Sequence, residues 1–219
     1  MKDFTKAYEL LSNSYNRFRY PKDEEPSFTF FDNNCENVIF SCPHAVKQMR
    51  NGQLKSADYN TGPLGLALHS LGQNVLIKTK NCNDDANYDL VSPYKDYLIQ
   101  LINEKKYNFV IDLHGMSETR DELICLGTNF GKNLNNCDKI TELFYKIATS
   151  HNFQSDEIKV DHPFSASYEG TISAYIRAKT SINALQIELN SLIFKNREST
   201  IKLLQILDEF ASTIENNNL

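Results

Sequence analysis

Three short apolar segments of the sequence end in, or contain, side chains that bind metals or move protons. The first is followed by His44, the second carries Asp112 and His114 at its end, and Glu188 interrupts the third. Hydrolytic zinc sites hold the ion with about three imidazole or carboxylate side chains and leave one position open for water. A nearby carboxylate can take a proton from that water. The residue types therefore predict a hydrolytic zinc site, provided that the three segments end at one place.

Each of these side chains also has a structural explanation. A histidine at a strand end can be held by hydrogen bonds alone, and Glu188 can be half of a buried ion pair. A metal-free network of hydrogen bonds therefore stays open as an alternative to the zinc site. His69 and His151 lie inside and near the end of helix patterns, and we expect both to be structural. For His162, in a loop, both a structural role and a contact with substrate stay open.

The elements that must position these side chains alternate between strand and helix. Strands are predicted at residues 37–42, 74–80, 108–114, 123–128 and 184–190, and helices at 61–72, 92–106, 138–150 and 197–214. Ser92 is expected to cap the second helix, and Pro93 to be its first residue. The alternation favours one α/β domain over residues 1–219, with a central mixed, mostly parallel sheet between helices. Ligands of such sheets collect beyond the carboxyl ends of the strands.

Composition excludes several other classes of protein. The net charge is -5 and the lysines and arginines are scattered, so no nucleic-acid partner is expected. No apolar run approaches the ~20 residues that cross a bilayer, so no membrane partner is expected either. The polar N-terminal segment has no signal-peptide core, which predicts a cytoplasmic protein. The five cysteines show no CxxC spacing and are expected to be reduced thiols. The sequence carries no indication of an oligomeric state.

Six short segments occur in the order found in N-formylglutamate amidohydrolase-like proteins, and residues 37–195 resemble that family. The segments are Pro43-His44-Ala45 and residues 55–62 (KSADYNTG), 83–89 (NDDANYD), 112–115 (DLHG), 169–176 (EGTISAYI) and 185–190 (LQIELN). The resemblance implies a fold similar to zinc carboxypeptidases, with one zinc ion per chain. It also implies hydrolysis of an amide bond beside a carboxylate-bearing group, as in N-formylglutamate.

The resemblance also implies a set of ligands and a catalytic base. These are His44, Asp58 and His114 as zinc ligands and Glu188 as the base. Zinc carboxypeptidases place a carboxylate ligand three residues after the first histidine, where this sequence has Lys47, so the ligand is expected further along the chain at Asp58. Asp58 can instead cap the helix that begins near Thr61. Glu118, the next acid after His114, is the candidate ligand if Asp58 is only a cap.

Substrate-binding residues follow from a departure from the family pattern. The Asp-x-Asn segment of the family usually continues into an arginine that binds a substrate carboxylate, whereas Tyr88 follows Asn87 here. Asn87 is still expected to hydrogen-bond to the substrate. Arg120, Arg50 or Arg177 can supply the missing positive charge, and each of them can equally be a surface residue.

The sequence thus predicts a zinc-dependent hydrolase that cleaves an amide bond of a small N-acyl amino acid or peptide-like substrate. Glu188 is the expected general base, and Asp112 is expected to orient a ligand imidazole. The alternative is a protein that binds zinc and a small acidic ligand or peptide without turnover. The presence of Glu188 favours the enzyme, because a site that only binds needs no base.

Overall fold

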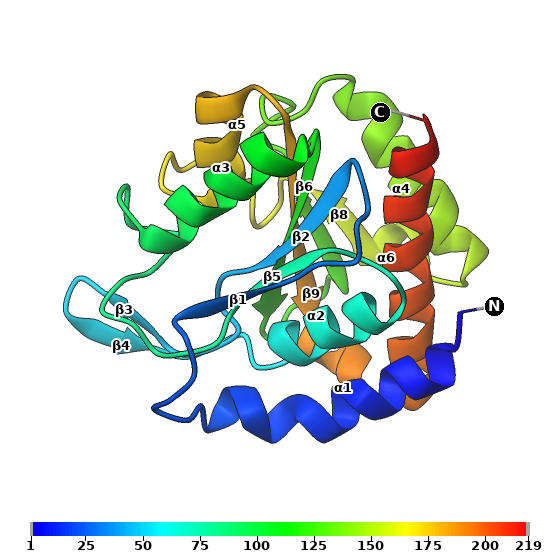
Figure 1. The fold of residues 1–219 in the computed structure, drawn as a ribbon. Helices are drawn as coiled ribbons and strands as arrows, with labels where there is room; N and C mark the ends of the chain where they lie inside the picture. The colour runs from blue at the N-terminus through cyan, green and yellow to red at the C-terminus, as the bar shows by residue number, and fades with distance from the viewer. Residues whose placement is uncertain (1, 218–219) are drawn as a thin grey trace.

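A seven-stranded sheet forms the centre of the structure, a computed structural model that describes residues 2–217 (Figure 1). The strand order is β1-β5-β2-β6-β9-β7-β8. The strands are β1 (Phe28–Phe31), β2 (Val38–Cys42), β5 (Val75–Lys78), β6 (Phe109–Met116), β7 (Ile124–Gly127), β8 (Ile158–Val160) and β9 (Asn183–Asn190). Strands β3 (Gln48–Arg50) and β4 (Gln53–Lys55) form a separate antiparallel hairpin.

The sheet is mixed, as predicted. Strands β5, β2, β6 and β9 run parallel to one another, and β8 pairs in parallel with β7. Strand β1 is antiparallel to β5, and β7 is antiparallel to β9. The strand expected at residues 123–128 is therefore present as β7 but opposes its neighbour, because an apolar run indicates burial and carries no information on strand direction.

Helices cover both faces of the sheet. They are α1 (Phe4–Arg19), α2 (Thr61–Ser70), α3 (Pro93–Lys105), α4 (Cys137–Ser150), α5 (Ile172–Thr180) and α6 (Arg197–Asn217), with short 3₁₀ helices η1 (Ser155–Glu157) and η2 (Ser191–Lys195). Helices α1, α2, α4 and α6 pack on one face, and α3 and α5 on the other (Figure 1). The predicted single α/β domain is confirmed. Within residues 2–217, no helix is both long and apolar enough to cross a membrane.

The alternation of side chains along β6 decides where its polar residues point. Ile111 and Leu113 belong to the core beneath α1, α2, α4 and α6, whereas Val110 packs beneath α3 and α5. Successive residues of a strand face opposite sides of the sheet. Asp112 and His114 therefore lie on the same face as Val110, at the carboxyl end of the strand and below the loops that lead to and from α3 and α5.

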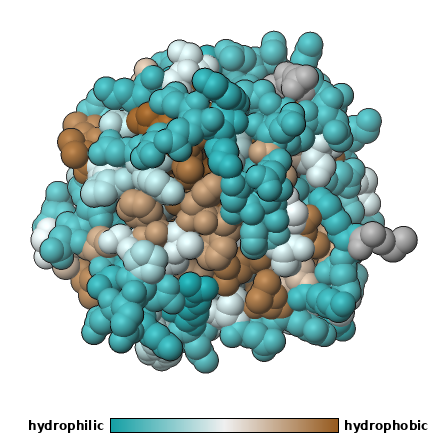
Figure 2. All heavy atoms as spheres, viewed as in Figure 1, coloured by the Kyte–Doolittle hydropathy of each residue, from teal (hydrophilic) through white to brown (hydrophobic). Residues whose placement is uncertain are grey.

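Several elements were not predicted from the sequence, namely α1, β1, the β3–β4 hairpin, β8 and α5. Helix α1 buries only Ala7, Leu11 and Phe18, too few to give a clear helical period. Strand β1 is the exposed edge of the sheet and each of its residues is half-buried. Figure 2 shows a mostly hydrophilic face whose apolar atoms gather near the centre, in the area where Figure 1 places β1.

Helix α3 begins at the predicted residue, but Ser92 does not make the predicted cap hydrogen bond. Pro93 is the first residue of the helix and Ser92 stands at the N-cap position. The Ser92 hydroxyl makes no cap hydrogen bond; it donates to the Asp84 carboxylate at 2.6 Å. This contact ties the start of α3 to the loop after β5, which carries part of the candidate site.

Candidate metal centre

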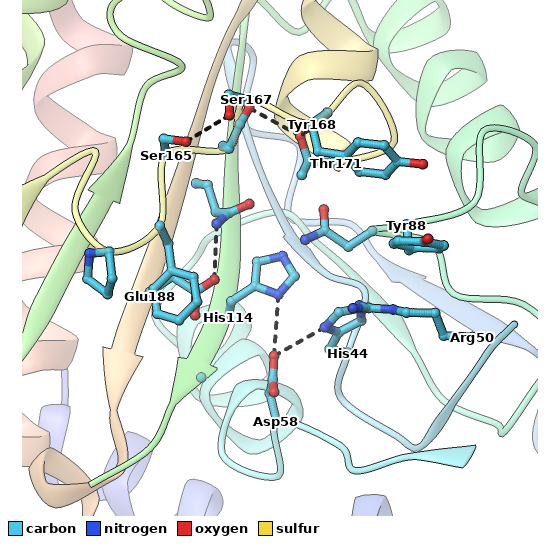
Figure 3. Close-up of a pocket in the computed structure, with 16 residues that line it drawn as sticks. His44, Arg50, Asp58, Tyr88, His114, Ser165, Ser167, Tyr168, Thr171 and Glu188 are labelled. Atoms are coloured by element: carbon cyan, nitrogen blue, oxygen red, sulfur yellow. Dashed lines mark hydrogen bonds and ion pairs between the residues drawn. The ribbon is translucent and has the colours of Figure 1, made fainter. Parts of the chain in front are cut away.

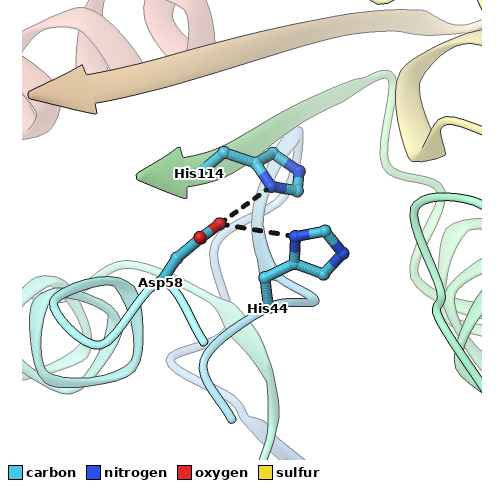
Figure 4. Close-up of side chains that lie close together, drawn as sticks. All are labelled: His44, Asp58 and His114. Atoms are coloured by element: carbon cyan, nitrogen blue, oxygen red, sulfur yellow. Dashed lines mark hydrogen bonds and ion pairs between the residues drawn. The ribbon is translucent and has the colours of Figure 1, made fainter. Parts of the chain in front are cut away.

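His44 and Asp58 come together because two loop segments run side by side. His44 lies two residues beyond the end of β2, and Asp58 lies between β4 and α2. The backbone N–H of Asp58 donates to the backbone carbonyl of His44 at 2.8 Å. The β3–β4 hairpin occupies the chain between them, so Asp58 returns to the strand end that His44 leaves (Figure 4).

The two imidazoles and the Asp58 carboxylate point at a common centre. The Oδ2 atom of Asp58 lies 3.4 Å from Nδ1 of His44 and 3.3 Å from Nδ1 of His114. Hydrogen bonds between an imidazole and a carboxylate are usually shorter, about 2.7–2.9 Å. Two donors that each lie about 2.0–2.1 Å from a tetrahedral zinc ion are separated by about 3.3–3.4 Å. Each nitrogen thus lies from this oxygen at the spacing of two neighbouring zinc ligands, and the three side chains form a group that can hold a metal ion.

Both imidazoles are held on their far side by a second carboxylate. Nε2 of His44 lies 2.7 Å from Oδ1 of Asp85, and Nε2 of His114 lies 2.9 Å from Oδ2 of Asp112. In each pair the carboxylate can accept from Nε2–H. The metal-free imidazoles can then carry a second proton on Nδ1 toward Asp58, and a bound metal ion would take the place of that proton. Such partners fix the tautomer and the orientation of metal-binding histidines. Asp112 has the position expected for an orienting residue.

Burial and nearby charge set the ionisation of the three acids around this cluster. Burial alone raises the pKa of Asp58, but hydrogen bonds from His114 and His44 outweigh it and hold the pKa below its usual range. The pKa of Asp85 is also lowered, because His44 and Arg50 outweigh the effect of burial. Burial raises the pKa of Glu188 to about 7, against smaller opposing contributions from the two imidazoles. Asp58 is therefore an anion at neutral pH, whereas Glu188 can both take up and release a proton there.

The side chain of Asp58 does not cap helix α2, which was the alternative role expected for it. Asn60 is the N-cap residue of α2. Asp58 contributes only its backbone carbonyl to the start of this helix, where it accepts from the N–H and the hydroxyl of Thr61 at 2.9 and 2.8 Å. Its carboxylate contacts the two imidazoles instead. Glu118, the other candidate ligand, pairs with Lys195 at 2.5 Å and lies outside the cluster.

A cavity of about 480 Å³, here called cavity 1, opens over the cluster (Figure 3). It is lined by residues 163–168 and by His44, Arg50, Asp58, Asn87, Tyr88, His114, Gly115, Thr171, Gln186 and Glu188. Glu188 is only 6% exposed and stands opposite His114 on the neighbouring parallel strand β9. Side chains opposite one another in a sheet share a face, so the β6–β9 register places Glu188 beside the cluster. Nε2 of Gln186 donates to Oε1 of Glu188 at 3.0 Å and orients it.

Two of the expected substrate-binding residues line cavity 1. Asn87 accepts from the backbone N–H of Ile172 through Oδ1 at 2.6 Å, and its Nδ2 makes no hydrogen bond within residues 2–217. Arg50, on the β3–β4 hairpin, donates through Nε to Oδ2 of Asp85 at 2.8 Å and stacks over the Tyr88 ring at 4.7 Å. A cation and an amide donor thus face the same space, which suits a substrate with a carboxylate.

The other two arginines lie elsewhere. Arg120 is exposed and stacks over the ring of Phe164 at 5.1 Å, beside cavity 1 but not on its lining. Arg177 donates to the backbone carbonyl of Ser181 at 2.5 Å and to Oδ1 of Asn135 at 2.7 Å, and so closes the end of α5. Arg177 does not line cavity 1, so its expected contact with substrate stays a prediction.

The remaining histidines are on the surface or outside the cluster. Nδ1 of His69 lies 2.6 Å from Nδ2 of Asn33, and Nε2 of His151 lies 2.8 Å from the Glu209 carboxylate. His162 is exposed and does not line cavity 1, although residues 163–168 immediately after it do.

Two residues of the site were missed by reasoning from the sequence. Asp85 is fully buried behind His44, and Gln186 orients Glu188. The sequence does hold a signal for Gln186, which stands two residues before Glu188 and so shares its face of the strand. Asp85 lies in a loop, where no period indicates the direction of a side chain.

Comparison with known proteins gives similarity of structure without similarity of sequence. No family model and no curated protein sequence matches this chain. An N-formylglutamate amidohydrolase from Ralstonia eutropha JMP134 matches 85% of this chain and 98% of its own, with a TM-score of 0.55 at 13% identity. A bacteriophage poly-gamma-glutamate hydrolase matches 95% and 96% of the two chains (TM-score 0.56, 14% identity).

A putative carboxypeptidase A from Shewanella denitrificans OS-217 matches 99% of this chain and 70% of its own, with a TM-score of 0.51 at 12% identity. At such identities the similarity establishes the fold. The fold is therefore that of zinc carboxypeptidase-like proteins, as the resemblance in sequence implied.

Proposed function

We propose that this chain is a zinc-dependent hydrolase that cleaves an amide bond of an N-acyl amino acid or a peptide-like substrate. The observation that carries the proposal is the position of Glu188, which lines the same cavity as His44, Asp58 and His114. A bound zinc ion would polarise the amide carbonyl and make a water more acidic. The similar folds named for amidohydrolase, poly-gamma-glutamate hydrolase and carboxypeptidase activities support the same class of reaction.

The residues of the chain have separate tasks in this reaction. Glu188 accepts a proton from the attacking water and passes it to the leaving nitrogen, for which a pKa near 7 is well matched. Gln186 holds the Glu188 carboxylate in place. Arg50 and Asn87 bind a carboxylate on the amine half of the substrate, since both line cavity 1. Asp85 and Asp112 keep the two imidazoles oriented.

The test compares zinc content and turnover in the parent and in Glu188→Gln. The protein, produced in zinc-supplemented medium without a chelating tag, should hold one zinc per chain and lose activity with a chelator. Glu188→Gln should keep its zinc and its substrate affinity but lose turnover by ~10²-fold or more, because the amide cannot accept the proton. A protein that purifies without stoichiometric zinc would contradict the metal site.

The same variant separates the enzyme from a protein that only binds. A parent that holds zinc and an N-acyl amino acid but turns over no member of a panel would be a binding protein. A Glu188→Gln variant that is folded, zinc-loaded and as active as the parent would remove Glu188 from the reaction. Thermal unfolding on the same preparation identifies the third case, in which activity falls only because a broken buried contact unfolds the protein.

A further inference from the structure

A second cavity borders the candidate metal cluster, and Glu188 is not on its lining. It measures about 420 Å³ and is called cavity 2. Its lining consists of residues 56–61 and 114–117 together with Tyr15, Leu189, Ser191 and Phe194. Asp58, His114 and Gly115 line both cavities, so both spaces border the cluster. Glu188, Arg50 and Asn87 line cavity 1 and not cavity 2.

The position of Glu188 decides which half of an amide faces which cavity. Hydrolysis consumes one water, breaks the C–N bond, forms a C–O bond and places a proton on the departing nitrogen. Glu188 supplies that proton from cavity 1, so the amine half must lie in cavity 1 when the carbonyl carbon is at the cluster. The acyl half then points away from the amine half, and cavity 2 is the second space that borders the cluster.

The lining of cavity 2 is largely apolar, and the residues that line this cavity alone carry no charge. Within residues 2–217, its charged side chains are only those it shares with cavity 1, Asp58 and His114. The rings of Tyr15, Tyr59 and Phe194 and the aliphatic side chains of Met116 and Leu189 line it. The centroids of the two tyrosine rings lie 6.4 Å apart. A space of this size holds on the order of ten waters, and an apolar group that displaces them gains binding free energy.

We infer that the substrate carries a bulky, uncharged acyl group, in contrast to a formyl group, which has nothing beyond the carbonyl carbon to enter cavity 2. The inference rests on the proposed hydrolase function and specifies its substrate: an amide with an apolar acyl half of several carbons and an amine half that bears a carboxylate. An N-terminally extended peptide-like substrate satisfies both conditions. N-formyl amino acids satisfy only the second.

The experiment measures kcat/KM of the zinc-loaded protein for N-formyl, N-acetyl, N-butanoyl and N-hexanoyl derivatives of glutamate, alanine and leucine. The alkyl acyl groups from acetyl upward have the same intrinsic reactivity, so a trend among them reports on binding. We expect kcat/KM to rise at least ~10-fold from acetyl to hexanoyl, the lower end of the effect of one methylene in an apolar pocket. Constant or falling values along a series that is hydrolysed would overturn the inference and leave the hydrolase standing.

Filling cavity 2 provides the structural control. Ser56→Trp should reduce the ratio of hexanoyl to acetyl kcat/KM toward unity, whereas Ser12→Trp, on the exposed face of α1 outside both cavities, should preserve it. Ser117→Trp repeats the test from the other wall, in case the change at residue 56 disturbs Asp58. Each variant is compared at equal zinc content. An unchanged ratio in both cavity variants would place the acyl group elsewhere and overturn the inference.

Binding gives a readout that does not depend on turnover. Calorimetry on Glu188→Gln with the same N-acyl glutamates should show affinity rising with acyl length, and the rise should disappear when Ser56→Trp is added. If the parent hydrolyses no member of the panel, the hydrolase proposal fails. Affinity that still rises with length then supports cavity 2 as an acyl site, and affinity that does not rise removes that site as well.

Discussion

The candidate metal cluster (His44, Asp58 and His114) and the loop wall of cavity 1 (Arg50, Asn87, Tyr88 and residues 163–168) are built in different ways. In the cluster, His44 and His114 are 8% and 2% exposed, and each imidazole has a carboxylate behind it. In the wall, the ring of Tyr168 is 45% exposed and stacks on Tyr88 with centroids 5.2 Å apart. Ion pairs hold the cluster, whereas ring contacts and backbone contacts hold the loops of the wall. Arg50 joins the two regions through its ion pair with Asp85.

The wall is nevertheless tied to the rest of the fold at a few points. The buried Lys95 donates to the backbone carbonyls of Asp89 and Gly170 at 2.6 and 2.5 Å and so joins the two loops of the wall. Gly170 packs so closely that a Cβ there would meet the carbonyl oxygen of Tyr88 at 2.0 Å. The difference teaches that changes in the cluster should act on the metal and on kcat, whereas changes in the wall should act on KM.

The largest effect is expected for His114→Ala. Loss of one of three ligands leaves an incomplete site, so zinc affinity should fall by more than the ~10–100-fold typical of losing an orienting partner, and activity should be lost. Zinc content after dialysis measures this. His69→Ala and His151→Ala are matched controls that should keep full zinc, because both side chains lie outside the cluster. Full zinc occupancy in His114→Ala would contradict the cluster as the metal site.

The next effect tests the carboxylates behind the imidazoles. Asp85→Asn and Asp112→Asn keep the shape and can still accept from Nε2, but they remove the charge that makes the imidazole a better ligand. Zinc affinity should fall by ~10–100-fold in each, as measured by competition with a chelator. Asp96→Asn, at an exposed position on α3, is the control. Unchanged zinc affinity in both variants would show that the charges of Asp85 and Asp112 do not strengthen metal binding.

A smaller effect, on substrate binding, is expected in the wall. Arg50→Met should raise KM for carboxylate-bearing substrates by about tenfold, the scale of a hydrogen bond to a charged group. Because Arg50 also donates to Asp85, which contacts His44, KM is compared with that of the parent at equal zinc content. Arg177→Met should leave KM unchanged, since that side chain closes α5 outside the cavity. The opposite pattern would move carboxylate binding from Arg50 to Arg177.

The smallest effect is on the stability of the metal-free protein. Burial raises the pKa of Glu188 from 4.5 to about 7, so the folded state binds this proton more tightly than the unfolded chain does. The stabilisation is complete below pH 4.5 and is lost as the pH rises through about 7. With chelator present, the thermal midpoint of the parent should therefore fall relative to that of Glu188→Gln over this range. Parallel curves for the two proteins would show that Glu188 ionises as freely as in water.

Part of the site could be predicted because its signals are local. A strand places every second residue on one face, so the sequence alone put Asp112 and His114 together at a strand end and left Glu188 as a costly acid in a buried strand. The strand-helix alternation likewise predicted an α/β sheet. These inferences need only neighbours in the chain.

The tertiary structure decided the rest, because it depends on contacts between distant segments. The β6–β9 register sets His114 opposite Glu188, and a one-residue shift would turn Glu188 to the other face. The backbone hydrogen bond from Asp58 to His44 brings a candidate metal ligand back across a hairpin. The packing of the loops places Asp85 beside His44 and the positive charge of Arg50 on the lining of cavity 1. The sequence determined which metal-binding and proton-accepting side chains are present. Long-range packing decided which of them come together, because neither strand register nor the path of a loop leaves a periodic pattern in the sequence.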